Sequence, residues 1–191
     1  MDKIEQEIRK QWFGTHVATL TTHGDVKVLE WAELGTNVYS CRYVFDGNKM
    51  YISGDIGSAV FLLTWKASVH SFNDVGIYYF DEKLAAYSGE RRDFNNDKAV
   101  MRIKEWRNGF DEDGQEYDSE MMDDLISDTL GSSSRDEWAI DCVNGRYNDF
   151  ISKLDQDYWE WFYSIGDGIP MRIHAYLIGL KMASEQLKEM I

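Results

Sequence analysis

Residues 37–65 read NVYSCRYVFDGNKMYISGDIGSAVFLLTW. Asp46-Gly47-Asn48 separates two runs that are rich in β-branched and aromatic residues. Glycine and asparagine tolerate the positive φ values that tight hairpin turns need. Residues 54–57, GDIG, indicate a second reversal before the run that ends at Trp65. We therefore expect neighbouring antiparallel strands throughout this stretch.

The same pattern of β-rich runs separated by turn residues extends toward the N-terminus. Turn signals at residues 23–25 and 34–36 divide the preceding chain into further strands, and we expect an antiparallel meander of about five strands within residues 16–65. One face of this sheet should be buried and the other exposed to solvent. Before it, the apolar spacing of residues 3–13 predicts a short amphipathic helix that ends at Gly14. The expected strands are Val17–Thr22, Val26–Ala32, Asn37–Phe45, Lys49–Ser53 and Ser58–Trp65.

After Trp65 the apolar residues follow a helical period. Ser134 followed by Glu137 fits a capping box, and Pro170 suits the first turn of a final helix. Strands first and helices afterwards predict an α+β fold with an N-terminal helix, a β-meander and a mainly helical C-terminal half. Pro170 is the only proline and no linker is apparent, so we expect a single domain over residues 1–191, with its helical part at 70–191. The expected helices are Asn73–Ser88, Asn95–Arg107, Asp118–Leu130, Ser134–Val143 and Pro170–Met190.

The apolar pattern also predicts the core. Cys41 and Cys142 form no CxxC pair, and we expect both to be buried thiols. On the final helix, a broad apolar stripe should dock against the rest of the fold: Ile173, Tyr176, Leu177, Leu180, Met182, Ala183 and Leu187. The predicted core residues are Val44, Tyr51, Ile52, Val60, Phe61, Leu63, Ile103, Trp106, Leu125, Ile140, Leu177 and Leu180.

The chain is strongly acidic, with 34 Asp and Glu against 20 Lys and Arg, a net charge of −14. Within residues 111–141, twelve acids face the single Arg135. Apolar residues at helical spacing continue through this stretch, which predicts a folded acidic surface rather than a disordered tail. Such a surface attracts basic proteins and repels nucleic acid. The expected partner-binding residues are Asp111, Glu112, Asp113, Glu116, Asp118, Glu120, Asp123, Asp124 and Asp128.

Several kinds of site find little support in the sequence. Residues 109–114, GFDEDG, have acids spaced like a calcium loop, but Gly109 and Glu116 occupy positions where such a loop needs a ligand and an apolar residue, so we expect an exposed acidic loop. The four histidines are widely spaced and no GxSxG motif is present. No catalytic residue, metal or cofactor is predicted. Asp55 should cap a tight turn, although its place at the rim of the sheet also suits a contact with a partner.

The composition argues against a membrane protein and against a nucleic-acid-binding protein. No apolar run is long enough to span a membrane and the N-terminus lacks a signal-peptide core, so we expect a cytoplasmic protein that contacts no membrane. The pairs of basic residues are small and flanked by acids, so direct nucleic-acid binding is not expected. In residues 158–163, YWEWFY, five aromatic residues lie close together, and Asp155, Asp157 and Glu160 are interleaved with them. We expect most of the aromatic residues in the core, with one or two exposed beside the acidic surface.

One segment resembles known proteins. Residues 43–61, YVFDGNKMYISGDIGSAVF, and residues 79–84, YFDEKL, are similar to a segment of small proteins from phages and mobile elements of bacteria. Some proteins of this type resemble the acidic anti-CRISPR inhibitors of RNA-guided nucleases. The resemblance lies within residues 38–88 and carries over no functional residue. It implies a host effector as the target and the cytoplasm of the bacterial host as the location.

Three hypotheses follow. The first is a phage-type inhibitor that binds a basic nucleic-acid-binding effector, foremost a CRISPR nuclease, and blocks its guide or target nucleic acid. The second is a metal-assisted nuclease acting on guide RNA with the partner's help, in which Asp111, Asp113, Glu116 and Asp118 hold Mg²⁺. The shortage of basic residues for a substrate argues against an enzyme. The third is a protein-binding module without a CRISPR connection.

Overall fold

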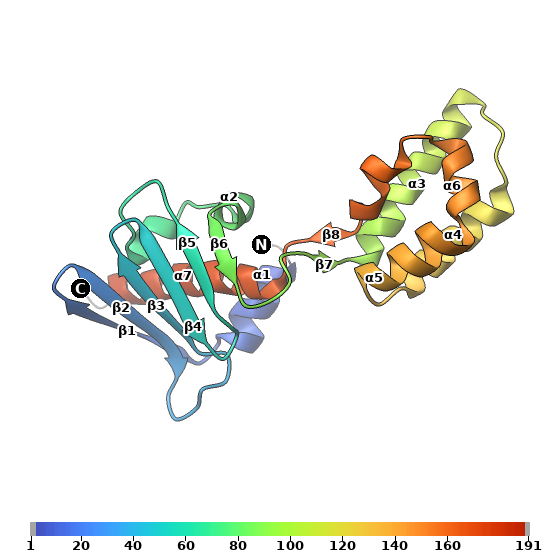
Figure 1. Ribbon diagram of the computed structural model, residues 1–191. Coiled ribbons are helices and arrows are strands. Elements are labelled where there is room, and N and C mark those ends of the chain that lie inside the picture. Colours follow the sequence, from blue (N-terminus) through green and yellow to red (C-terminus); the bar gives the residue numbers. More distant parts are fainter. Residues whose placement is uncertain (1–2, 190–191) are drawn as a thin grey trace. The chain divides into compact units, whose positions relative to one another are not determined.

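The computed structural model describes residues 3–189, and these group into two compact units (Figure 1). The strand unit is formed by residues 3–91 and 169–189, and the helical unit by Arg92–Gly168. Each unit has its own apolar core. In sequence, the helical unit is thus an insertion between two parts of the strand unit. The expectation of a single domain over residues 1–191 stays a prediction.

The strand unit contains a six-stranded sheet in which every neighbouring pair is antiparallel and the strands follow chain order. The predicted α+β class, N-terminal helix and meander are confirmed. The predicted helix at residues 73–88 is wrong in its second half, because the chain forms a sixth strand that pairs with the free edge of the fifth. The strands are β1 (His16–His23), β2 (Val26–Glu33), β3 (Cys41–Asp46), β4 (Lys49–Gly54), β5 (Ala59–Leu62) and β6 (Leu84–Tyr87).

One face of the sheet is covered by short helices and by the long C-terminal helix α7 (Met171–Glu189) (Figure 1). α7 approaches the sheet closely at Gly179, where an added Cβ would lie 2.6 Å from the hydroxyl of Tyr43. That hydroxyl donates a hydrogen bond to the carbonyl of Tyr176, 3.1 Å away, and the predicted apolar stripe of α7 faces the core. The short helices are α1 (Lys3–Glu7), η1 (Ile8–Trp12), η2 (Val69–Phe72) and α2 (Ile77–Glu82).

The predicted core is correct at seven positions: Ile52, Phe61, Leu63, Ile103, Leu125, Leu177 and Leu180 are buried, as are both cysteines. The prediction is wrong for Val44, Tyr51 and Val60. These three residues are cross-strand partners on the face of the sheet opposite to the one that the helices cover. Tyr51 is 38% exposed there. In the helical unit, Trp106 is only partly buried and Ile140 is 64% exposed.

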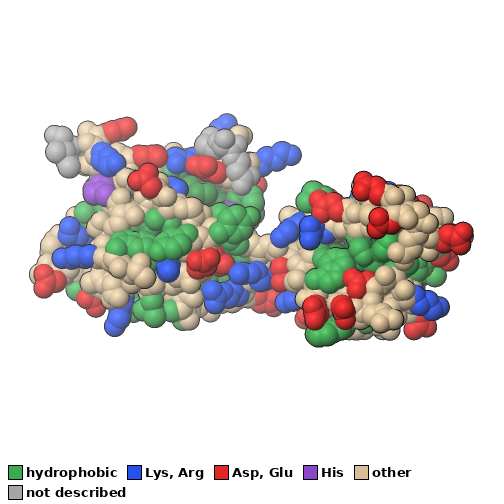
Figure 2. Space-filling model, turned by 90° about the horizontal axis from the view of Figure 1, so that it is seen from above, with side chains coloured by type: hydrophobic (Ala, Val, Ile, Leu, Met, Phe, Trp, Pro, Cys, Tyr) green, Lys and Arg blue, Asp and Glu red, His purple; other side chains and the backbone are tan. Residues whose placement is uncertain are grey.

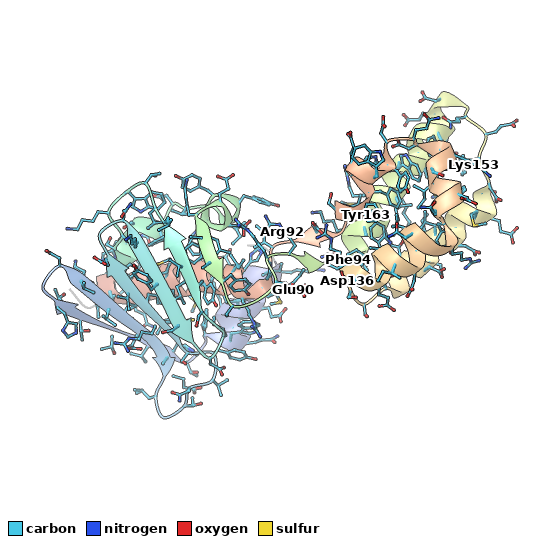
Figure 3. The ribbon with its side chains drawn as sticks, in the orientation of Figure 1. Glu90, Arg92, Phe94, Asp136, Lys153 and Tyr163 are labelled. Carbon is cyan, nitrogen blue, oxygen red and sulfur yellow. The ribbon has the colours of Figure 1, made fainter. Side chains whose placement is uncertain are left out.

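The helical unit packs around Trp138, which is fully buried and stacks on Phe94 and Phe162 with ring centroids 5.6 and 5.5 Å apart. Figure 3 labels Phe94 on β7, at the start of the unit. β7 and β8 pair and join the two ends of the unit, so residues 70–191 are not wholly helical. The elements are β7 (Asp93–Phe94), α3 (Asn96–Asp113), α4 (Ser119–Gly131), α5 (Arg135–Glu137), η3 (Trp138–Arg146), α6 (Asn148–Leu154), η4 (Tyr158–Glu160), η5 (Phe162–Ser164) and β8 (Asp167–Gly168).

Helix ends largely follow the predicted signals. Ser134 accepts a hydrogen bond from the amide of Glu137, as a capping box requires, but the Glu137 carboxylate bonds to Ser133 instead of returning to Ser134. α7 begins directly after the buried Pro170. Within residues 3–189, no helix is both long and apolar enough to cross a membrane.

A candidate protein-binding surface on the helical unit

The acidity of the chain belongs almost entirely to the helical unit. Residues 92–168 contain 20 of the 34 acids and 8 of the 20 basic residues, a net charge of −12. The rest of the chain carries the remaining −2. Figure 2 shows acidic side chains spread over the visible face of the helical unit, with hydrophobic ones exposed between them. The predicted acidic surface is therefore a property of one unit.

Helix α3 is longer than predicted. We expected it to end near Arg107 and an exposed loop to follow, but the helix continues to Asp113. Phe110 is 9% exposed and lies seven residues after the buried Ile103, so the same face of the helix stays in the core. Gly114, with φ of 67°, then ends the helix. The residues spaced like a calcium loop are thus mostly helical, and the described residues contain no group of three His, Cys, Asp or Glu side chains placed to hold a metal.

The last turn of α3 carries three consecutive acids. Asp111, Glu112 and Asp113 are all exposed, and Glu116 follows in the connection to α4. The C-terminal end of a helix carries partial negative charge, so carboxylates there are unfavourable, and no basic residue lies in this turn. We call these four residues the acidic turn.

Internal bonds account for only one member of the acidic turn. The hydroxyl of Tyr117 donates a 2.7 Å hydrogen bond to Asp111, and this bond to a carboxylate raises the pKa of Tyr117. Glu112, Asp113 and Glu116 form no hydrogen bond or ion pair within residues 3–189. Protein stability therefore does not explain why these charges are present.

The acids at the start of α4 are different. Asp118 caps the helix, since its carboxylate accepts a 3.0 Å hydrogen bond from the amide of Met121. Glu120 lies in the first turn, where the positive end of the helix dipole favours a carboxylate. Both residues therefore have a structural explanation.

The acids further along α4 are paired with arginines. Arg107 lies 3.0 Å from Asp123, and Arg146 lies 2.5 Å from Asp124 and 3.1 Å from Asp128. These two arginines lie outside residues 111–141 in sequence and reach the acids through the fold. Arg135 instead pairs with Asp167 in β8, 3.3 Å away. Distant basic residues therefore neutralise part of the predicted surface.

Asp128 has a second partner. The hydroxyl of Tyr147 donates a 2.6 Å hydrogen bond to its carboxylate, and burial together with this bond raises the pKa of Tyr147. Nine acids are predicted to bind a partner. Four of them form hydrogen bonds or ion pairs within the helical unit: Asp118, Asp123, Asp124 and Asp128. Most of the acidic turn forms none.

The aromatic segment 158–163 is mostly structural. Phe162 is fully buried, and the indole of Trp161 donates a 2.9 Å hydrogen bond to Asp155. Tyr163, labelled in Figure 3, donates to the side chain of Asn144. Trp159 is the exception, with 60% of its surface exposed. Large apolar side chains also lie exposed at Leu130 and Ile140.

Asp55, expected at the rim of the sheet, has a structural role. Its carboxylate accepts a 2.9 Å hydrogen bond from the amide of Tyr39, whose φ of 54° lies in the left-handed region. The adjacent Gly54 is required, because an added Cβ would lie 2.1 Å from the carbonyl oxygen of Ser40. A contact between Asp55 and a partner stays a prediction.

The histidines show no catalytic arrangement in the described chain. His16 is 3% exposed, and one ring nitrogen lies 3.3 Å from the carbonyl oxygen of Tyr39. His70 lies 2.8 Å from the hydroxyl of Ser184, a geometry that could activate a nucleophile. Ser184 is fully buried, however, so a substrate has no access to it.

No protein-family model, curated protein or solved structure matches this chain. Function is therefore inferred from the charges and contacts described above.

Proposed function

We propose that the helical unit binds a basic surface of a partner protein through the acidic turn, Asp111, Glu112, Asp113 and Glu116. The observation that carries this proposal is the position of the charges. Three carboxylates occupy the helix end at which they are least favourable, and three of the four acids lack any internal bond in the described chain. Proteins depart from locally stabilising choices chiefly at functional sites.

The partner class follows from the chemistry of the surface. A groove that holds nucleic acid is lined with basic residues that neutralise phosphates, and a rigid array of carboxylates can occupy the same groove. RNA-guided nucleases hold their heteroduplex in such a channel, and they are the partner that the resemblance of residues 43–61 implies. The protein would then act as a phage-type inhibitor that blocks guide or target nucleic acid.

Exposed apolar side chains support a protein partner. Trp159, Leu130 and Ile140 are each more than half exposed in the same unit. Protein interfaces combine a charged rim that speeds association with apolar anchors that slow dissociation, and tryptophan is common among the anchors. A purely repulsive or solubilising surface would not need these side chains.

No specific contact favours the nuclease alternative. Its four proposed Mg²⁺ ligands would have to converge, yet Asp111 accepts from Tyr117 and Asp118 caps α4. The choice between a CRISPR partner and another basic partner is left to experiment.

The test measures loading of guide RNA onto a purified RNA-guided nuclease in the presence of this protein. The four-acid variant carries Asp111→Asn, Glu112→Gln, Asp113→Asn and Glu116→Gln. A control variant loses the same charge elsewhere in the helical unit, through Glu120→Gln, Asp123→Asn, Asp136→Asn and Asp141→Asn. The wild type and the control should slow loading, whereas the four-acid variant should not. The effect should weaken as salt rises, since the screening length is about 8 Å at physiological ionic strength.

Each other outcome is informative. Equal loss of inhibition in both variants would show that total charge acts, and would reject the acidic turn as the site. A wild type that leaves loading unchanged while binding another basic protein would reject the CRISPR partner alone. Cleaved guide RNA would replace the proposal with the nuclease alternative.

A further inference from the structure

The strand unit contains a recess of about 380 Å³ with an aromatic wall. The rings of Trp65 and Tyr79 are nearly parallel, with centroids 5.8 Å apart and planes 16° apart. Trp65 is held from behind by an edge contact with Phe72, and Tyr79 is 41% exposed. The other lining residues are Ser71, Asp74, Val75 and Gly76. The contact with Phe72 thus holds Trp65 in place, while part of the Tyr79 side chain is exposed to solvent.

A second recess of about 640 Å³ also has Trp65 in its lining. It is built by the β1–β2 turn, the β3–β4 turn and the segment after β5. Its polar lining residues are Asp25, Asp46, Asn48, Thr64 and Lys66. Trp65 therefore borders two recesses, one mainly apolar and one with polar and apolar surface in similar amounts.

Carboxylates outnumber basic groups in this lining. Asp74 lines the first recess, and Asp25, Asp46 and the single Lys66 line the second. The three carboxylates form no hydrogen bond or ion pair within residues 3–189. Outside the lining, the ammonium of Lys83 lies 4.4 Å from the centroid of the Tyr79 ring. This distance is within the range of a cation–π contact, and an arginine on the same face of Tyr79 would take the place of Lys83.

We propose that the recess beside Trp65 and Tyr79 binds an arginine side chain of a partner. A guanidinium is flat and weakly hydrated, so it stacks on aromatic rings while its N–H groups bind carboxylates such as Asp74. A lysine ammonium is compact and more strongly hydrated, which suits this site less well. The proposal concerns the strand unit and does not depend on the acidic turn.

The probe is the peptide acetyl-Gly-Arg-Gly-amide, and the comparison peptide carries citrulline, which has the shape of arginine without its charge. The readout is the NMR resonance of the Trp65 indole N–H, which has no hydrogen-bond partner in the described part of the chain. The arginine peptide should shift this resonance and bind more tightly than the citrulline peptide. The ratio expected for a cation on an aromatic surface is about 2- to 30-fold.

Matched variants locate the site. Tyr79→Leu and Asp74→Asn should each weaken the arginine peptide at least about twofold. Tyr78→Leu removes a neighbouring tyrosine that is 78% exposed and lies outside the recess lining, and Glu90→Gln removes an exposed carboxylate outside it. Neither control should change binding.

A further variant blocks the recess without touching a ring or a carboxylate. A Cβ at Gly76 would meet no atom within 4 Å, and the φ of −80° suits any residue, so Gly76→Gln should enter the recess without strain. It should abolish the shift caused by the arginine peptide. Equal binding of both peptides, or equal weakening by Tyr78→Leu and Tyr79→Leu, would overturn the proposal. A shift caused by a neutral sugar and not by the arginine peptide would overturn it as well.

Discussion

The helical unit carries a net charge of −12 and the rest of the chain only −2, although the helical unit is the smaller of the two units. In the strand unit, polar side chains serve the fold. Gln186 on α7, for example, accepts from the amide of Ala18 and donates to the carbonyl of His16, which satisfies the open edge of β1. In the helical unit, by contrast, the carboxylates of the acidic turn lie at the end of α3 where the helix dipole is unfavourable to negative charge. The charge of this chain is therefore localised, and the helix dipole makes the end of α3 an unfavourable place for part of it.

The largest expected effect concerns the core of the strand unit. Leu177→Ala removes a side chain that is 4% exposed where α7 meets the sheet, and it should lower the free energy of unfolding by about 2–5 kcal/mol. Urea unfolding measures this change. The control Ile140→Ala truncates a side chain that is 64% exposed, and should cost less than about 0.5 kcal/mol.

The same experiment tests the single domain. If residues 1–191 unfold as one, amide exchange in both units should quicken together in Leu177→Ala. Exchange that changes only in the strand unit would contradict the single-domain prediction.

The second expected effect is a pH dependence of stability that belongs to the strand unit, because all four histidines lie there. Burial lowers the pKa of His16, and this outweighs the opposing influences of the Tyr39 carbonyl and Glu33. The unfolded chain therefore binds a proton that the folded chain does not, and stability should fall as the pH drops below about 6.5. The contribution is at most about 1.4 kcal/mol per pH unit.

The measurement is the free energy of unfolding at several pH values for the wild type and His16→Gln. The variant should show a shallower loss of stability in acid, whereas His23→Gln, at the exposed end of β1, should follow the wild type. Identical pH dependence in all three proteins would mean that His16 does not titrate with unfolding.

A third effect compares acids within the helical unit. Asp118→Ala removes the cap of α4 and should destabilise this unit by about 0.5–2 kcal/mol, while Asp118→Asn keeps an oxygen for the amide of Met121 and should cost less. Amide exchange along α4 reports the difference. Wild-type exchange in Asp118→Ala would mean that the cap contributes nothing.

The sequence predicts the sheet well because its turns are marked by glycine and asparagine, and it predicts α7 because Pro170 and a broad apolar stripe mark that helix. It misses β6, since the four residues LAAY have no strong strand propensity and gain their structure by pairing with β5. The wrong core positions Val44, Tyr51 and Val60 arise because both faces of the sheet carry apolar residues, so alternation cannot identify the covered face.

The candidate site could be predicted only in part. The run of acids is plain in the sequence, but which of them are neutralised depends on Arg107 and Arg146, which reach α4 through the fold. The continuation of α3 through Phe110 could have been read from its spacing to Ile103. The division into two units is only weakly marked in the sequence: Gly166, Gly168 and Pro170 surround the second boundary, but no such cluster lies at Arg91–Arg92.

The central claim is that the acidic turn is present in spite of its effect on stability. The most direct measurement is the free energy of unfolding of the helical unit in the wild type and the four-acid variant, at low and at high salt. The variant should be more stable at low salt, by about 0.3–1 kcal/mol for each charge removed from the end of α3. The difference should shrink near 1 M salt, where the screening length is about 3 Å. A four-acid variant that is less stable than the wild type at both salt concentrations would show that these acids serve the fold, and would contradict the account.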